Sequence, residues 1–273
     1  MLNYITWNVS PDIFRIPDHV WLIGGFAVRW YGLLFALAFV VGYIIMQKIF
    51  KNEGLSNKLL DELSTYMIIF TIVGARLGHV FFYEPGYFLD HPLEILMIWK
   101  GGLASHGAAI GILVGLYIFA RKNHKPYIWI MDRIVIVVAL GGAFVRTGNL
   151  MNSEIFGDVT SLPWGFKFVN SNYGVNPRHP TQIYEALSYL ALFFFLYRYY
   201  WKHKGHPRPG TLFGYFLIVL FTARFLIEFI KIPQVGFEKN MALDMGQWLS
   251  IPFILAGIAL LIWSGRKYKK PET

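Results

Sequence analysis

The sequence of 273 residues contains no cysteine. Disulfide bonds, thiolate metal sites and a cysteine nucleophile are therefore excluded. Any thiol chemistry must use a thiol that a substrate brings. Acidic residues are also scarce, 16 against 25 lysines and arginines, which leaves a formal net charge of +9.

Charge as a whole is rare: only 15% of the residues are charged and 55% are hydrophobic, with a mean hydropathy of +0.45. Such a chain is too apolar to cover itself with polar surface, so the composition predicts an integral membrane protein. A positive net charge also suits nucleic acid. Here, however, the basic residues are scattered between apolar runs, as in cytoplasmic loops that face anionic lipid. We expect the lipid bilayer as a partner and no nucleic acid.

The N-terminal stretch 1–20 carries Pro11, Asp12 and Arg15 and has no apolar core, so we expect no cleaved signal peptide. Apolar runs of about 18–21 residues, the length that a bilayer requires, predict an all-α protein with about seven transmembrane helices. The predicted spans are 26–46, 63–83, 103–120, 128–145, 181–200, 211–231 and 246–264. We expect residues 1–273 to form one membrane-embedded domain.

The basic residues of the loops predict the orientation of the spans, because lysine and arginine accumulate on the cytoplasmic side. The richer side has Lys48, Lys51, Lys58, Arg121, Lys122, Lys125, Arg198, Lys202, Lys204, Arg208, Arg266, Lys267, Lys269 and Lys270. The poorer side has Arg15, Arg76, Lys100, Arg146, Lys167, Arg178, Lys231 and Lys239. The N-terminus is therefore expected outside and the C-terminus in the cytoplasm.

In this orientation, polar side chains from six predicted spans fall in the extracytoplasmic half. Polar groups that serve only packing need not share a depth, so we expect a single outward-opening polar cavity. Its predicted members are Tyr31, Arg76, His79, His106, Arg146, Tyr184, Glu185, Arg224 and Glu228. The long connection at about 147–180 is expected to form a small ordered extracytoplasmic head, with Trp164–Phe168 as a strand.

The densest chemistry lies in Arg146–Gly157, directly after the apolar run Ile134–Val145. A guanidinium at this depth is costly unless it has a partner or a ligand. A snorkelling arginine at a helix end would be the structural alternative. Because Asn149, Asn152 and Glu154 follow so closely, we favour an anion-binding site at the membrane boundary.

Three further groups have both structural and functional interpretations. Arg224 and Glu228, four residues apart on one helical face, form either an intrahelical ion pair or a support that holds a guanidinium for phosphate. His106 lies among glycines and is either structural or an acid/base group. Tyr31 is either an interfacial belt residue or part of the site. Because Arg224 and His106 share the predicted extracytoplasmic depth with Arg146, we favour the functional interpretation for both.

The stretch Arg178–Glu185 places Pro180 at the start of the fifth span. Gln182 and Glu185 share a helical face, and we expect Glu185 to balance a neighbouring arginine rather than to touch substrate. A metal site is disfavoured, because the candidate histidines do not have ligand spacing on one element. These histidines are His79, His106 and His179.

Five ordered stretches resemble the motifs of the prolipoprotein diacylglyceryl transferase family. They are Gly101–Gly107, Arg146–Gly157, Arg178–Glu185, Arg224–Glu228 and Met245–Ser250. The resemblance extends from Trp30-Tyr-Gly32 almost to the end of the chain, and the twelve-residue block Arg146–Gly157 is specific by itself.

The resemblance implies transfer of a diacylglyceryl group from phosphatidylglycerol to the lipobox cysteine thiol in a bacterial prolipoprotein signal peptide. Glycerol 1-phosphate is released, in the first step of lipoprotein maturation. The family needs no cofactor. It works on the outer side of the bacterial inner membrane with seven spans, which agrees with the orientation expected from the loop charges.

The resemblance also implies roles for individual residues. The important arginines of the family fall on Arg146 and Arg224, its histidine on His106 and its N-terminal tyrosine on Tyr31. The implied phosphatidylglycerol-binding residues are Arg146, Asn149, Asn152, Glu154, Gly157 and Glu228. Some members carry a tyrosine four residues before the arginine matched by Arg224, where this chain has Leu220. An obligatory catalytic hydroxyl at this position is therefore not expected, and Tyr215 and Tyr31 are the two candidates to substitute for it.

As a mechanism, we expect Arg146 and Arg224 to hold the phosphate and to stabilise charge on the departing glycerol phosphate. A free thiol with a pKa of about 8.5 needs activation, for which His106 is the first candidate base and Tyr31 the second. A transporter or channel would need polar inner halves, which are mostly apolar here apart from Arg133. Another membrane enzyme acting on lipid phosphates is the second alternative, and thiol-dependent release of glycerol phosphate would separate it.

Overall fold

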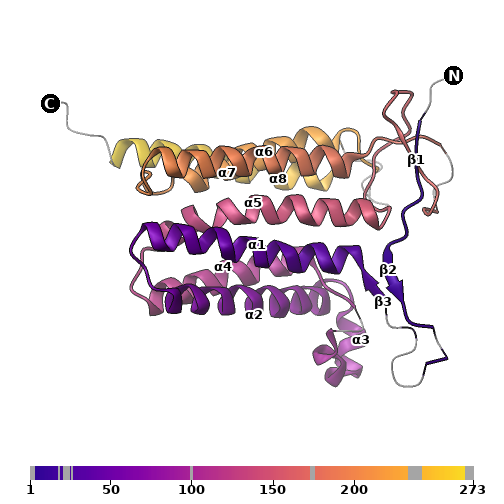
Figure 1. Cartoon of the computed structure of the whole chain (residues 1–273), viewed down its shortest axis with the longest axis horizontal. Helices are drawn as coiled ribbons and strands as arrows, with labels where there is room; N and C mark the ends of the chain where they lie inside the picture. The colour runs from indigo at the N-terminus through magenta and orange to yellow at the C-terminus, as the bar shows by residue number, and fades with distance from the viewer. Residues whose placement is uncertain are drawn as a thin grey trace. The chain divides into compact units, whose positions relative to one another are not determined.

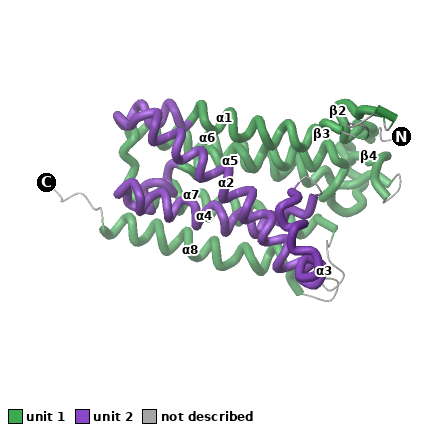
Figure 2. Tube along the Cα trace, turned by 90° about the horizontal axis from the view of Figure 1, so that it is seen from below, with its two compact units in different colours: residues 1–45, 134–273 green, residues 46–133 purple. Residues whose placement is uncertain are grey.

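The computed structural model describes residues 4–17, 19–20, 25, 27–98, 101–172, 176–232 and 242–267, and most of them are helical (Figure 1). The chain divides into two compact units, one formed by residues 1–45 and 134–273 and the other by residues 46–133 (Figure 2). The boundaries between the units fall inside the helices α1 (Trp30–Asn52) and α5 (Tyr127–Met151). Each of these helices therefore contributes residues to both units.

Each of the seven predicted spans overlaps one long helix. Besides α1 and α5, these are α2 (Asn57–Phe82), α4 (Ser105–Lys122), α6 (Thr181–Lys202), α7 (Thr211–Glu228) and α8 (Met245–Lys267). Within the described part of the chain, five helices are long and apolar enough to cross a membrane: α1, α2, α5, α7 and α8.

The two remaining long helices, α4 and α6, carry more polar residues. The 18-residue helix α4 includes His106, Arg121 and Lys122, and α6 includes Glu185 and Arg198. These side chains lower the hydropathy of helices that still have the length of a span. The structure is therefore that of a membrane protein with several helices, five of which are long and apolar enough to be spans.

The part of α5 that carries Arg146 belongs to the first unit. Half of the apolar window of α5 is buried, against 22% in α1 and in α8. Gly142 of α5 lies against the ring of Tyr189 in α6, and Gly42 of α1 lies against Val137 of α5. The helix is thus shielded by protein to a degree that suits a polar side chain in a membrane.

Helices α7 and α8 approach each other closely beside α6 (Figure 1). A Cβ atom on Gly257 would lie only 2.9 Å from the carbonyl oxygen of Gly214, so the two glycines allow the backbones to meet. The hydroxyls of Thr211 and Ser264 are 3.1 Å apart across the same pair of helices.

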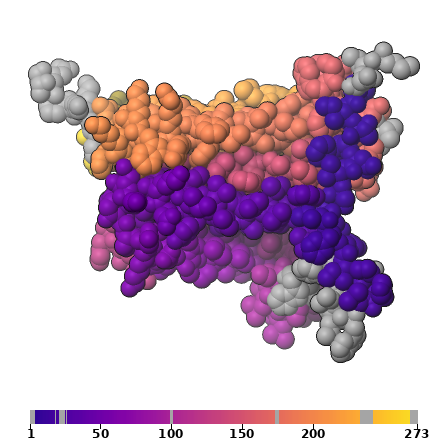
Figure 3. All heavy atoms as spheres, in the orientation of Figure 1, coloured from indigo at the N-terminus to yellow at the C-terminus, as the bar shows by residue number. Residues whose placement is uncertain are grey.

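The connection between α5 and α6 pairs with an N-terminal segment that was not predicted to be structured. Strand β1 (Ile5–Trp7) pairs in parallel with β4 (Phe166–Phe168), which confirms part of the predicted strand Trp164–Phe168. The Trp7 indole Nε1 donates to the carbonyl of Leu150 at 3.0 Å, and Phe156 packs in the same cluster. Figure 3 shows the side chains of the N-terminal segment against those of the connection after α5.

A second small sheet precedes α1. Strand β2 (Asp12–Arg15) pairs in antiparallel fashion with β3 (Ala27–Arg29), and Arg15 and Arg29 both contact the carboxylate of Asp12. The backbone N–H of Trp30, the first residue of α1, donates to the carbonyl of Pro11 at 3.1 Å. These contacts fix the start of α1, where Tyr31 lies.

The second unit consists mainly of α2 and α4, joined by the short helix α3 (Pro85–Asp90) and the 3-10 helix η1 (Pro92–Leu96). A Cβ atom on Gly78 would lie 2.6 Å from the Cα atom of Gly107, and one on Gly74 would lie 2.8 Å from the Cα atom of Gly111. Glycine is therefore required for the close packing of these two helices. Several loop charges used for the orientation lie outside the described residues, namely Lys100, Lys239, Lys269 and Lys270.

Candidate active site

Arg146 lies inside α5 rather than after it. The predicted span ended at residue 145, but the helix continues to Met151. The polar residues of this last part fit a helix because their side chains find partners: the Thr147 hydroxyl donates to the carbonyl of Ala143 at 2.9 Å. The helix thus extends beyond the end of the predicted span, and it orients Arg146 and Asn149 itself.

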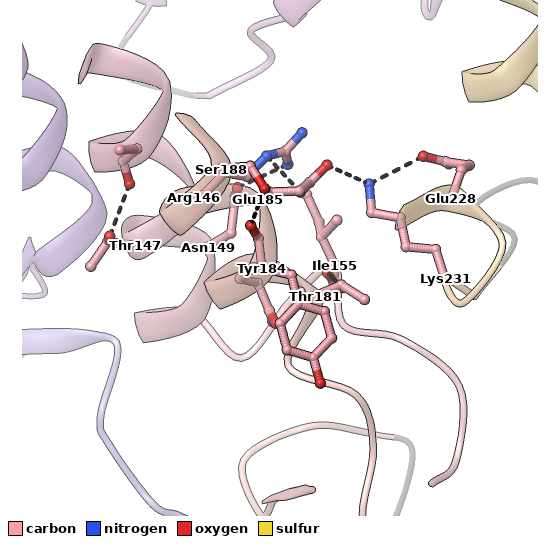
Figure 4. A network of polar contacts seen from close by, with 12 residues as sticks. Arg146, Thr147, Asn149, Ile155, Thr181, Tyr184, Glu185, Ser188, Glu228 and Lys231 are labelled. Carbon is pink, nitrogen blue, oxygen red and sulfur yellow. Dashed lines mark hydrogen bonds and ion pairs between the residues drawn. The ribbon is translucent and has the colours of Figure 1, made fainter. Parts of the chain in front are cut away.

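The guanidinium of Arg146 is held from two sides. Its Nε atom lies 2.8 Å from Oε2 of Glu185, and its Nη1 donates to Oδ1 of Asn149 at 3.2 Å (Figure 4). The side chain of Glu185 is completely shielded from solvent and that of Arg146 is 13% exposed. Tyr189 adjoins the same guanidinium. The expectation that Glu185 balances a neighbouring arginine is confirmed.

Glu154 is the second centre of the network. One of its carboxylate oxygens accepts hydrogen bonds from the side-chain amides of Asn149 at 2.8 Å and Asn152 at 3.1 Å. Asn149 therefore bridges Arg146 and Glu154, accepting from one and donating to the other. Four residues that the sequence singled out in Arg146–Gly157 are brought together by these contacts.

The loop that presents Glu154 has an unusual backbone. Ser153 and Ile155, on either side of Glu154, have φ angles of 53° and 58°. This left-handed conformation is costly for residues other than glycine, especially for a β-branched one. The first turn of α6 holds it in place: the Thr181 hydroxyl donates to the carbonyl of Ile155 at 2.9 Å and Gln182 Nε2 to that of Glu154 at 2.7 Å.

Gly157 has a backbone role in the structure. Its N–H donates to the carbonyl of His179 at 2.8 Å, and a Cβ atom there would lie 2.8 Å from the Cβ of His179 and 2.9 Å from the methyl of Thr181. Glycine is therefore needed so that the end of the loop can pack against the start of α6.

Lys231 also belongs to this network, although from the sequence it was counted only among the outer loop charges. Its Nζ atom lies 3.0 Å from Oε1 of Glu185 and 3.3 Å from Oε2 of Glu228 (Figure 4). The carboxylate of Glu228 thus contacts this lysine and also interacts electrostatically with Arg146. The spacing of three residues between Glu228 and Lys231 was the signal in the sequence that could have revealed the pair.

Tyr31 packs against the site at the start of α1. A Cβ atom on Gly148 would lie 2.8 Å from the Tyr31 ring, so this glycine of α5 leaves room for the tyrosine. The Tyr31 hydroxyl interacts electrostatically with Glu154 and with Arg146. These contacts favour a place in the site over a role as an interfacial belt residue.

Arg224 belongs to the same unit and lies in the last part of α7, partly exposed. It interacts electrostatically with Tyr189, the residue that adjoins Arg146. Tyr215, by contrast, lies near the start of α7 and packs against Phe195 and Tyr199. At 1.5 Å per residue it is about 13 Å from Arg224 along the helix, so the contacts disfavour it as a replacement for a tyrosine at position 220.

His106 lies in the second unit, as an exposed residue in the first turn of α4. The neighbouring Arg76 is buried, and its guanidinium donates to four backbone carbonyls, including those of Gly101 at 2.6 Å and Gly102 at 3.1 Å. The ring of His79 stacks on Tyr83. Arg76 therefore serves to hold the glycine-rich stretch before α4 rather than to present a free cation.

The sequence was compared with known proteins. The family model described as prolipoprotein diacylglyceryl transferase matches residues 18–263. A phosphatidylglycerol–prolipoprotein diacylglyceryl transferase of Tolumonas auensis is 46% identical over 262 residues, covering 96% of this chain and 98% of the relative. Proteins with the same name from Chloroherpeton thalassium and Porphyromonas gingivalis are 42% and 44% identical, with 99% of this chain covered in both cases and 98% and 97% of those relatives.

The match includes every motif on which the resemblance was based. It also covers both compact units, so the relationship concerns the whole chain and not one part of it. The chain belongs to the prolipoprotein diacylglyceryl transferase family.

Proposed function

We propose that this protein transfers the diacylglyceryl group of phosphatidylglycerol to the cysteine thiol of a prolipoprotein lipobox. The sulfur forms a thioether bond with the terminal glyceryl carbon. The bond between that carbon and the phosphate oxygen breaks, and its electron pair leaves with glycerol 1-phosphate. The thiol proton goes to a base. The family relationship and the names of the relatives support this reaction.

The observation that carries the proposal is the geometry of Arg146. The guanidinium is oriented by Glu185 and Asn149 and lies on a helix whose apolar window is half buried in the protein. Arginine has five N–H donors, of which these two contacts occupy only part, and the planar group is suited to a phosphate. Arg146 would hold the donor phosphate and stabilise the charge that develops on the leaving group.

We assign roles to the remaining residues as follows. Arg224 supplies a second positive charge to the phosphate. Asn149, Asn152 and Glu154 form a hydrogen-bonded wall that orients the glycerol headgroup. His106 is the first candidate base for the thiol and Tyr31 the second, because Tyr31 adjoins Glu154 and Arg146.

We infer that all seven long helices cross the inner membrane, with the N-terminus outside, the C-terminus in the cytoplasm and the site in the extracytoplasmic half. The 18 residues of α4 and the 22 of α6 have the length that a span requires, about 27–33 Å at 1.5 Å per residue. We further infer that residues 1–273 act as one transferase domain, because α1 and α5 each contribute to both units.

A transporter or channel is the main alternative, and the contacts of Arg133 argue against it. Arg133 was the chief polar residue expected in an inner half. Its Nε atom lies 2.9 Å from Oε1 of Glu53, and the two side chains are only 5% and 7% exposed. A buried, paired arginine is unsuited to line a conducting path.

The test is release of glycerol phosphate from labelled phosphatidylglycerol by the purified protein, with a lipobox peptide and with its Cys→Ser variant. With the cysteine peptide we expect a thioether product and one glycerol phosphate released per thioether formed. With the Cys→Ser peptide we expect neither product. Release that is independent of the thiol would show a lipid phosphatase or a related enzyme instead.

A further inference from the structure

We propose that Lys231 is a positioning residue for the donor site: its ammonium group neutralises Glu185 and Glu228, so that Arg146 remains available for the phosphate of phosphatidylglycerol. This inference rests on the proposed function for the identity of the ligand. The placement of Lys231 rests on the contacts of the side chain and of the backbone around it.

The two oxygens of Glu185 have different partners. Oε1 lies 3.0 Å from Lys231 Nζ, and Oε2 lies 2.8 Å from Arg146 Nε. The same ammonium group is 3.3 Å from Glu228 Oε2. The charges therefore alternate in the order Arg146, Glu185, Lys231 and Glu228, as Figure 4 shows.

These four side chains are shielded from water, with exposed fractions of 13%, 0%, 3% and 12% in that order. Charges in such an environment are weakly screened, so each one affects the others strongly. Glu228 already interacts electrostatically with Arg146. Without the ammonium group, two carboxylates would act on one guanidinium and compete with a bound phosphate.

The backbone fixes Lys231 in this place. Its N–H donates to the carbonyl of Glu228 at 3.1 Å, and the residue forms an antiparallel bridge with Gly157 at the end of the Arg146–Gly157 stretch. The N–H of Asp158 donates to the carbonyl of Ile230 at 2.9 Å. A lysine anchored in this way is not a snorkelling residue or a simple topology charge.

Gly246 supports the same arrangement from α8. A Cβ atom at this position would lie 2.7 Å from Oε1 and 2.8 Å from Oε2 of Glu228. The absence of a side chain therefore leaves the space that the carboxylate occupies beside Lys231. The motif Met245–Ser250 thereby acquires a structural reason for its glycine.

The test compares Lys231→Met, which removes the charge at similar length, with Lys231→Arg, which keeps it. KM for phosphatidylglycerol and kcat are measured at saturating peptide, together with direct binding of short-chain phosphatidylglycerol to the detergent-solubilised protein. We expect Lys231→Met to weaken binding and raise KM by about tenfold, and Lys231→Arg to stay within about threefold. Wild-type affinity in Lys231→Met would overturn the proposal.

Arg133→Met is the matched control, because it also removes a buried cation paired with a carboxylate. Arg133 precedes Arg146 by about 20 Å along α5 at 1.5 Å per residue. We expect this variant to lose thermal stability without a change in KM for phosphatidylglycerol. An equal increase of KM in both variants would show a general structural effect and overturn the proposal.

A double-mutant cycle tests the charge argument itself. Lys231→Met should raise KM more in the wild-type background than in Glu228→Gln, where one competing carboxylate has already been neutralised. The same fold-increase of KM in the wild-type and Glu228→Gln backgrounds would contradict competition between Glu228 and the phosphate. If the wild-type protein forms no thioether, the proposed function fails, and the binding measurement still decides the role of Lys231.

Discussion

The carboxylate of Glu185 lies 2.8 Å from Nε of Arg146 and joins the first turns of α6 to the last part of α5. The two residues belong to separate motifs, Arg178–Glu185 and Arg146–Gly157, which the chain keeps far apart in sequence order. Because both side chains are nearly shielded from water, each depends on the other for charge compensation. The pair therefore links the stability of the fold to the orientation of the proposed phosphate-binding group.

Replacement of Glu185 by glutamine should destabilise the protein strongly. The change preserves shape but leaves Arg146 and Lys231 with less compensation, and loss of one partner from a buried ion pair costs about 3 kcal/mol or more. Thermal unfolding in detergent measures the effect. Glu84→Gln is the control, because Glu84 is 53% exposed in its contact with His79 and should contribute less than about 1 kcal/mol. Equal shifts for the two variants would contradict the prediction.

Thr181→Val should loosen the loop that presents Glu154. The hydroxyl of this fully buried residue donates to the carbonyl of Ile155, and its removal leaves that carbonyl without the bond at a cost of about 1–3 kcal/mol. We expect a lower melting temperature and lower transferase activity. Thr65→Val is the control, since the exposed Thr65 hydroxyl only bonds within its own helix. Unchanged activity in Thr181→Val would show that the conformation of this loop does not affect the site, and would contradict the prediction.

Ser153→Gly is expected to stabilise the protein. Ser153 has a φ angle of 53°, and its buried hydroxyl has no hydrogen-bond partner among the described residues. Glycine relieves both costs, and after subtraction of its own entropy on folding the gain should be about 1 kcal/mol. Thermal unfolding gives the result. A lower melting temperature would indicate that the hydroxyl makes a stabilising contact.

Gly107→Ala should disrupt the packing of α2 and α4. The added Cβ would collide with the backbone of Gly74 and lie 2.6 Å from the Cα atom of Gly78, so the helices must separate at a cost of about 1–3 kcal/mol. Gly86→Ala is the matched control in the same unit, because nothing lies within 4 Å of its Cβ position. The melting temperature should fall for Gly107→Ala only. Equal melting temperatures of the two variants would contradict the close packing of α2 against α4.

The sequence predicted the positions of the long helices because each apolar run has the length of a span. It also predicted the grouping of Arg146, Asn149, Asn152 and Glu154, since these residues are close along the chain. The supporting role of Glu185 followed from the need of a membrane arginine for a counter-charge.

Other features depend on contacts between distant parts of the chain. Strand β1 has only three residues and pairs with β4, so neither periodicity nor local turn signals could reveal it. The extension of α5 beyond Arg146 depends on side-chain partners such as the bond from Thr147. Lys231 looked like an ordinary loop charge because Glu185 and Gly157, which it contacts, lie far from it along the chain.

The most direct test of the account is thioether formation on a lipobox peptide with labelled phosphatidylglycerol, measured for wild type, Arg146→Ala and Arg146→Lys in protein shown to be folded. We predict a loss of about 100-fold or more for Arg146→Ala, in line with removal of a group that stabilises developing charge, and a partial loss for Arg146→Lys. Near wild-type activity in folded Arg146→Ala would contradict the assignment of Arg146 to the donor phosphate.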